Sequence, residues 1–238
     1  MIESHLPTGT PRLLAVYSYR FDAHLVPAMH ENIAPVVDGW IGYDDRGATG
    51  EFSDEPARRF LLLSAARDAG AEWVLAIDPD ERIETRARRK IPRLLRGDAR
   101  AYAVAFRELY SPTEYRVDGI WGQKSQARLI RVADGVIPPR RDGLHTSWHD
   151  LIPRTRPRKS GINLYHLKMI DRARRQARAD LYTRLDPEHR MQSIGYGYLA
   201  DEAGLRLRRI PRGRGYLPGH IDDGALWMSP GHDEGGPA

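Results

Sequence analysis

The sequence predicts an α/β protein in which a mostly parallel central sheet is flanked by helices and followed by a helical or irregular C-terminal part. Apolar runs at residues 12–20, 36–45 and 72–78 are typical of buried strands, and helical segments with short connections separate them. Such alternation predicts parallel pairing with right-handed crossovers. The carboxyl ends of the strands are therefore expected at one edge of the sheet, where ligands of such sheets bind.

The first strand, RLLAVYSYR at residues 12–20, is apolar until it reaches polar side chains at its end. We expect Asp22 to cap the helix that follows, because aspartate accepts hydrogen bonds from the free N–H groups of a first helical turn. The second strand, VVDGWIGYDD at residues 36–45, ends in two aspartates. It leads into a loop whose glycines relax the backbone.

A second helix, PARRFLLLSAARDAG at residues 56–70, starts at a proline, which suits a first turn, and stops at a glycine. The third strand follows it. Its sequence, EWVLAIDPDE, changes from an apolar run to three carboxylates, Asp78, Asp80 and Glu81, with Pro79 narrowing the turn between the first two. Polar groups thus end each of the three strands at the edge expected to bind ligands.

The pattern is looser in the second half of the chain. Residues 84–97 predict a helix broken at Pro92, and the runs at 101–109 and 127–132 alternate like strands of a more open, mixed sheet. Residues 135–158 are rich in proline, arginine and histidine, and apolar residues interrupt them. We expect long functional loops there rather than a domain linker.

A strand at residues 162–168 and a highly charged helix at 171–185 are expected next, followed by a last helix at 187–203. The tail is rich in glycine, proline and acid and is expected to be irregular. The predicted organisation is a core domain at 11–167, C-terminal helices at 168–212 packed on the same domain, and an irregular tail at 213–238.

Composition limits the kinds of partner. The 238 residues include 37 Lys and Arg against 32 Asp and Glu, a formal net charge of +5, which suggests anionic partners. There is no cysteine, no apolar run near the roughly 20 residues of a membrane span, and no signal-peptide pattern, so we expect a cytoplasmic protein. The helix at 171–185 could rest peripherally on anionic lipid, or could be a solvated helix that pairs with nearby acids.

The acidic turn after the third strand admits two interpretations. Two aspartates one residue apart can direct oxygens at one Mn²⁺ or Mg²⁺, which binds through one or two carboxylates, water and substrate phosphates. Such an ion would neutralise a diphosphate leaving group. The alternative is a capped turn, because acids are favoured at helix starts. The position at the sheet edge, together with Asp44 and Asp45, favours the metal interpretation.

The residues of this turn carry a resemblance. EWVLAIDPDERI resembles a segment of the family 2 glycosyltransferases, and ARR before the apolar helix and YDDRGATGEF resemble two other segments of that family more loosely. The similarity spans residues 13–131. It implies a GT-A fold with a nucleotide-binding half at 11–97 and an acceptor half at 98–167. It also implies transfer of a hexose from a nucleotide-diphosphate sugar, usually with inversion, to a glycan, a lipid-linked or a small-molecule acceptor.

The resemblance further implies roles for individual residues. In that family the ends of the first two strands hold the base and ribose, and an arginine before the third strand contacts diphosphate or braces the acidic turn. Nucleotide contacts are thereby assigned to Tyr17, Ser18, Arg20, Asp44, Asp45, Arg58 and Asp78, and the metal to Asp78, Asp80 and His166. This chain departs from the family pattern at Arg59, where the family has asparagine, and at Ala48, where it has serine.

An inverting transferase needs a base that deprotonates the acceptor hydroxyl. In the family this is generally a carboxylate of the second half, which points to Asp150 in HTSWHDL and then to Asp118 in YRVDGIWG. Asp150 could instead be a surface acid paired with an arginine, and His166 a partly buried histidine with satisfied partners. His145 and His149, four residues apart, are a weak zinc signal because no catalytic glutamate accompanies them.

Two other functions use parts of the same pattern. Nucleotidyl transfer to a sugar phosphate would use the same sheet edge and metal, but it is usually announced by a glycine-rich basic loop, which YSYRFDAH lacks. A nucleic-acid-binding protein would gather its basic residues with stacking aromatics on one face. Here the basic residues are dispersed along the chain, so no nucleic-acid partner is expected.

Overall fold

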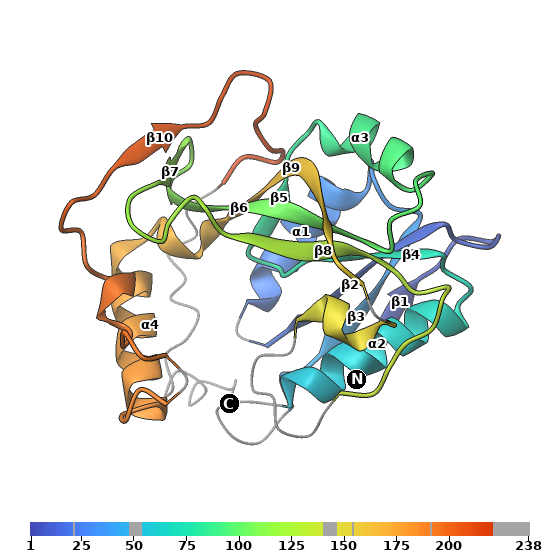
Figure 1. Ribbon diagram of the computed structural model, residues 1–238, viewed down its shortest axis with the longest axis horizontal. Helices are drawn as coiled ribbons and strands as arrows, with labels where there is room; N and C mark the ends of the chain where they lie inside the picture. Colours follow the sequence, from blue (N-terminus) through green and yellow to red (C-terminus); the bar gives the residue numbers. More distant parts are fainter. Residues whose placement is uncertain (21, 48–53, 140–146, 154, 191, 221–238) are drawn as a thin grey trace, which may run out of the picture.

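The structure, a computed structural model, describes residues 1–20, 22–47, 54–139, 147–153, 155–190 and 192–220. Within them the chain is an α/β protein with a ten-stranded mixed sheet (Figure 1). The strands are β1 (Ile2–His5), β2 (Leu13–Tyr19), β3 (Gly39–Asp44), β4 (Trp73–Ala76), β5 (Glu81–Ile83), β6 (Ala101–Ser111), β7 (Glu114–Arg116), β8 (Ser125–Arg131), β9 (Arg158–His166) and β10 (Leu207–Arg209). The α-helices are α1 (Val26–Ile33), α2 (Glu55–Asp68), α3 (Ala87–Leu94) and α4 (Arg172–Leu185).

The sheet runs in the order β1-β3-β2-β4-β8-β6-β7-β10, and β9 pairs with both β6 and β5. Strand β2 is parallel to β3 and β4, as the first half of the chain predicts. Strands β6 and β9 are also parallel, but β8 is antiparallel to both β4 and β6. The expectation of a mostly parallel sheet is therefore wrong. Strands β6 and β8 are joined through β7 without a helix, and such a connection suits antiparallel pairing.

Both faces of the sheet are covered, because successive residues of a strand point to opposite faces. Leu13 and Ala15 of β2 join a core cluster with side chains of α1 and α3. Leu14 and Val16 join another cluster with α2 and the 3₁₀ turn Trp148–Leu151. A sheet covered on both faces leaves the ends of its strands as the place where polar side chains can meet a ligand.

The expected strands and the helix of the first half are confirmed. The runs at 12–20, 36–45 and 72–78 contain β2, β3 and β4, and the helix expected at 56–70 is α2. Asp54 caps α2, because its carboxylate accepts a hydrogen bond of 3.0 Å from the backbone N–H of Ala57. The short strands β1, β5, β7 and β10 were not expected, since three or four residues give little periodicity.

Two expected helix signals are wrong. The Asp22 side chain makes no cap to a helix; it accepts a hydrogen bond of 3.2 Å from the backbone N–H of Arg20. A 3₁₀ turn, Ala23–Leu25, precedes α1. Helix α3 is not broken at Pro92 but continues to its last residue, Leu94. In so short a helix the proline removes a single hydrogen bond.

The last helix expected, at 187–203, is also wrong. The described part of this stretch contains a 3₁₀ turn, Gly197–Leu199, instead. The Asp186 carboxylate accepts a hydrogen bond of 2.7 Å from the backbone N–H of Arg190, and Gly195 adopts a φ of 69°. A side chain that takes a backbone donor and a left-handed glycine both oppose helix propagation.

Helix α4 lies at the end of the molecule opposite α2 (Figure 1). Asp171 caps it by accepting a hydrogen bond of 2.8 Å from the backbone N–H of Arg174. Arg174 and Arg175 are both buried. Arg175 donates to the carbonyl oxygen of Met169 at 2.6 Å and pairs with Glu202. Arg175 therefore fixes α4 to the preceding 3₁₀ turn and to Glu202, and neither of these two buried arginines belongs to a lipid-facing surface.

Some expectations fall on residues outside the description. His145 and Ala48 are among them, as is the tail beyond residue 220. The described residues 213–220 form neither helix nor strand, and the irregular tail at 213–238 stays a prediction. In the described ranges no helix is long and apolar enough to cross a bilayer. The division of the chain at residues 97 and 167 stays a prediction.

Candidate functional site

The carboxyl ends of β2, β3 and β4 meet at one edge of the sheet, as their parallel pairing requires. Tyr19 is in register with Asp44, and the backbone N–H of Asp45 donates to the carbonyl oxygen of Tyr19 at 2.9 Å. On the other side of β2, the N–H of Ile77 donates to the carbonyl oxygen of Val16 at 3.1 Å. The residues that follow these strands are therefore brought to a common edge.

The acidic turn at the end of β4 is held by its own third carboxylate. The backbone N–H of Glu81 donates to the carbonyl oxygen of Asp78 at 2.9 Å. In return the Glu81 carboxylate accepts a hydrogen bond of 2.9 Å from the N–H of Asp78. Glu81 then begins β5 and pairs with His166 of β9. Glu81, which the sequence left without a role, thus shapes the turn that carries Asp78 and Asp80.

Arg128 of β8 supplies positive charge to this turn. Its guanidinium Nη2 lies 3.2 Å from Oδ2 of Asp78 and contacts Oε1 of Glu81. Arg128 and Glu81 are fully buried, whereas the Asp78 side chain is 36% exposed. Burial raises the pKa of Glu81 to about 8 against the pull of Arg128. For Asp78, burial acts in the same direction, but Arg128 leaves its pKa lowered.

A second buried group links the turn to β6 and β9. His166 lies between two carboxylates, with Nε2 at 3.0 Å from Asp80 and Nδ1 at 2.9 Å from Glu108. Burial lowers the pKa of His166, but Asp80 and Glu108 leave it raised. In turn, burial raises the pKa of Glu108, but Lys168 at 3.8 Å and His166 bring it down to about 2. The imidazolium form is therefore favoured between two ionised carboxylates.

Asp22 lies close to the same turn. Burial, together with the negative charges of Asp80 and Asp78, raises the pKa of Asp22 to about 7. Its carboxylate is held by the backbone N–H of Arg20. The end of β2 therefore adds a further carboxyl group to the acidic turn.

The residues predicted to contact nucleotide lie in different surroundings. Asp45 is buried and pairs with Arg58 of α2 at 2.6 Å, so Arg58 braces the end of β3. Asp44 pairs with Arg46 at 2.7 Å. The side chain of Tyr17 is fully buried, with its hydroxyl 2.8 Å from the His30 ring, so it is not presented at the edge. Ser18 and Arg20 are partly exposed there.

The two predicted catalytic bases, Asp118 and Asp150, interact with residues other than those of the acidic turn. Asp118 pairs with Arg116 at 2.9 Å and accepts a hydrogen bond of 2.9 Å from the N–H of Arg206. Asp150 is 57% exposed and closes a capping box with Ser147. Among the described residues, neither forms an ion pair or hydrogen bond with Asp78 or Asp80.

An arginine connects the region of Asp150 with the turn. Arg59 of α2 lies over the ring of Trp148, with 4.9 Å between its guanidinium carbon and the ring centroid. Its charge also helps to lower the pKa of Asp78. Asp150 sits in the same 3₁₀ turn as Trp148. Arg59 therefore places a cation between the Trp148 turn and the acidic turn.

The metal assignments of Asp78, Asp80 and His166 stay predictions. In the part of the chain that the structure describes, no group of three His, Asp or Glu side chains is arranged to hold a metal ion. Asp78 and Asp80 offer carboxylate oxygens of the kind that Mg²⁺ and Mn²⁺ prefer. In this arrangement the ring nitrogens of His166 lie 3.0 Å from Asp80 and 2.9 Å from Glu108, and its role as a third ligand stays a prediction.

Sequence reasoning missed the cluster members from the second half: Glu108, Arg128 and Lys168. Two of them had a recognisable signal in the sequence. Arg128 interrupts the apolar run ARLIRV and Glu108 interrupts AYAVAFREL, both at positions where strand alternation points inward. A charged residue at an inward strand position is almost always paired, and so indicates a buried partner.

Comparison with known proteins identifies no family for the chain. No protein-family model and no curated protein matches the chain. Among solved structures, one described as a glycosyltransferase involved in the glycosylation of the major capsid of PBCV-1 is 14% identical, with a TM-score of 0.30. The alignment covers 51% of this chain and 61% of that one, so the chain spans about three fifths of that protein's length. A likeness this distant assigns no function.

Proposed function

We propose that the protein is a glycosyltransferase of GT-A type that transfers a hexose from a nucleotide-diphosphate sugar to an acceptor hydroxyl. The observation that carries the proposal is the acidic turn of Asp78 and Asp80, set at the edge where the parallel strands β2, β3 and β4 end. Ligands of open α/β sheets bind at that edge. A turn that places carboxylates at that edge offers oxygen ligands to a divalent cation and hydrogen-bond acceptors to a donor sugar.

The donor would lie across the ends of β2 and β3. Asp45, fixed by Arg58 at 2.6 Å, and Asp44 offer carboxylates to ribose hydroxyls or base N–H groups. Ser18 of β2 and Arg20, just after its end, would complete this part of the site. Tyr17 is excluded from direct contact in this arrangement because its side chain is fully buried.

The diphosphate would lie at the acidic turn, where its charge must be offset. A bound Mn²⁺ or Mg²⁺ would be held by Asp78 and Asp80 and would stabilise the departing diphosphate. The cations of the chain itself contribute nearby: Arg128 contacts Asp78, and the charge of Arg59 acts on the same carboxylate. His166 neutralises Asp80 rather than serving as a ligand.

In the transfer, the acceptor oxygen forms a bond to the anomeric carbon while the bond from that carbon to the diphosphate oxygen breaks. The proton of the acceptor hydroxyl passes to a carboxylate base, and the nucleotide diphosphate leaves. Asp150 suits the base better than Asp118 because it is 57% exposed, whereas Asp118 is engaged by Arg116. An exposed carboxylate can receive an acceptor from solvent.

Calorimetric titration with UDP, GDP and dTDP in the presence of Mn²⁺ tests the proposal. We expect at least one of them to bind, and the substitutions Asp78→Asn and Asp80→Asn each to weaken binding about tenfold or more through loss of a charged contact. Asp98→Asn is the control, because Asp98 is an exposed carboxylate paired with Arg158 at 2.6 Å. Failure of all three nucleotides to bind, or an equal loss in the control, would contradict the proposal. Repetition in EDTA shows whether binding needs the metal.

A further inference from the structure

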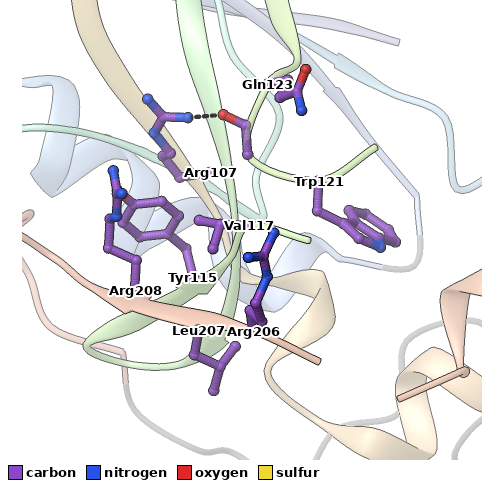
Figure 2. A pocket seen from close by; sticks show the side chains of 9 residues that line it. Arg107, Tyr115, Val117, Trp121, Gln123, Arg206, Leu207 and Arg208 are labelled. Carbon is purple, nitrogen blue, oxygen red and sulfur yellow. Dashed lines mark hydrogen bonds between the residues drawn. The ribbon is translucent and has the colours of Figure 1, made fainter. Parts of the chain in front are cut away.

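A cationic hollow lies on the part of the molecule formed by β7, β10 and the loop after β7 (Figure 2). Its volume is about 420 Å³, within the range of small-ligand sites. The described residues that line it are Arg107, Tyr115, Val117, Trp121, Gly122, Gln123, Arg206, Leu207 and Arg208. Three of these are arginines and none is acidic.

Strand pairing explains why two of the arginines face the hollow together. Strand β10 is antiparallel to β7, and Arg208 is directly opposite Tyr115. Two residues beyond Tyr115, the N–H of Val117 donates to the carbonyl oxygen of Arg206 at 2.9 Å. Residues opposite each other in a sheet point to the same face, and so do alternate residues of one strand. Arg206 and Arg208 therefore emerge on the face that carries Tyr115 and Val117.

The third arginine is fixed in position. Arg107 of β6 donates from Nη1 to the carbonyl oxygen of Gly122, the bond drawn in Figure 2, and from Nε to Oδ1 of Asn163 at 3.3 Å. Its guanidinium lies over the ring of Tyr115, 5.2 Å from the centroid. These contacts leave the Nη2 group free of assigned partners among the described residues. The donor is preorganised, which lowers the entropy lost when a ligand binds.

The charge of the hollow is not balanced by the groups around it. Arg206 and Arg208 form no ion pair with any described residue, and both are exposed. The acids next to lining residues in the chain are Glu108, Glu114 and Asp118. Asp118 pairs with Arg116 at 2.9 Å, Glu108 lies 2.9 Å from His166, and Glu114 is opposite Arg209. Guanidinium groups gathered in one concavity repel one another and create a local positive potential. An anion bound among them would remove that repulsion.

We propose that this hollow binds a phosphate-bearing anion. Guanidinium groups match the tetrahedral oxygens of phosphate with paired hydrogen bonds. The apolar walls of Tyr115, Val117 and Trp121 would cover the part of the ligand that carries the phosphate. Free phosphate and the phosphate of a lipid headgroup present the same group to the arginines, so the site accepts either source.

The hollow is distinct from the acidic turn. Arg107 and Glu108 are neighbours on β6 and so point to opposite faces of the strand. Arg107 lines the hollow, whereas Glu108 is buried against His166 at 2.9 Å. A phosphate ligand here would not share its contacts with a donor bound at Asp78, so the proposal stands or falls independently of the proposed transferase activity.

The test is a titration of the full chain with inorganic phosphate and pyrophosphate, and a co-sedimentation with vesicles of phosphatidylcholine alone or mixed with phosphatidic acid. The double variant Arg206→Ala/Arg208→Ala removes two exposed donors and leaves Arg107 in place. The matched control is Arg88→Ala/Arg89→Ala on α3, which makes the same change in net charge at exposed positions. We expect the first double variant to lose affinity about tenfold or more and the control to keep it.

The two arms identify the source of the phosphate. Binding of the soluble anions that depends on Arg206 and Arg208 supports a soluble ligand, and binding only to acidic vesicles with the same dependence supports a headgroup. The proposal is overturned if neither probe binds at up to about 10 mM, the weak end of specific affinities. It is equally overturned if the control loses as much affinity as the double variant, because binding would then follow net charge alone.

Discussion

Replacement of Arg128 by methionine is expected to lower the free energy of unfolding by about 3–5 kcal/mol. The guanidinium is almost completely buried and is the ion-pair partner of the fully buried Glu81 and of Asp78. Methionine of similar length fills the space but removes the cation that opposes the raised pKa of Glu81, so Glu81 must either take up a proton or stay ionised without a partner, and Asp78 loses its ion pair. Urea denaturation followed by tryptophan fluorescence measures the difference.

The control for this prediction lies on the same strand. Arg131 is also in β8, but its side chain is 34% exposed and pairs with Glu72 at 3.4 Å. The same substitution, Arg131→Met, removes an exposed ion pair worth no more than about 1 kcal/mol. If Arg128→Met lost no more stability than Arg131→Met, the acidic turn would not depend on Arg128. The double change Glu81→Gln/Arg128→Met should recover part of the loss, since no buried charge then remains unpaired.

The first half of the fold could be predicted because its signals are local. The strands β2, β3 and β4 are apolar runs bounded by polar residues, and α2 has a proline in its first turn and Gly70 after its end. The second half could not be predicted in the same way. Whether β8 runs parallel or antiparallel to β4 depends on how the chain returns to the sheet, and a hairpin-like return through β7 has no periodic signature.

The site shows the same division. Asp78 and Asp80 could be found because they follow a strand, and the edge at which strands end is fixed by topology. Their partners could not, because the pairing of Arg128 with Asp78 joins residues 50 positions apart in the chain. For His166, the position along the chain predicted one neighbour but not the other. The position beside Asp80 was predicted, but its contact with Glu108 depends on the register of β6 and β9.

The acids of the turn are neutralised by cations of the chain itself. Each carboxylate of the turn has a cation from a distant strand: Arg128 serves Asp78 and Glu81, and His166 serves Asp80. The turn can therefore form on folding without any added ion, since the desolvation penalty of its acids is offset within the chain. A ligand that reaches Asp78 meets a carboxylate already fixed in place, which favours binding through preorganisation.

The substitution His166→Phe is expected to destabilise the protein by about 3–5 kcal/mol at pH 6, because phenylalanine keeps the ring but leaves Asp80 and Glu108 buried without their shared cation. The control is His30→Phe, because burial lowers the pKa of His30 and favours its neutral form. Its loss is a single neutral hydrogen bond with the hydroxyl of Tyr17, 2.8 Å away and worth about 1 kcal/mol. Equal losses in the two variants would show that His166 carries no charge in the folded state.

The pH dependence of the same comparison tests the sign of the charges. The pKa of His166 is raised in the folded state, so its stabilisation is complete below the ordinary value of 6.5 and is lost as the pH rises through the raised pKa. The pKa of Glu108 is lowered to about 2, so its stabilisation is complete above 4.5 and is lost as the pH falls. The stability gap between the wild-type protein and His166→Phe should therefore be widest between pH 4.5 and 6.5 and should narrow on both sides. The gap narrows in alkali only if the stabilisation depends on a proton bound to the His166 ring, because that proton is lost as the pH rises. A gap that widens steadily up to pH 9 would therefore mean that a neutral histidine holds the two carboxylates.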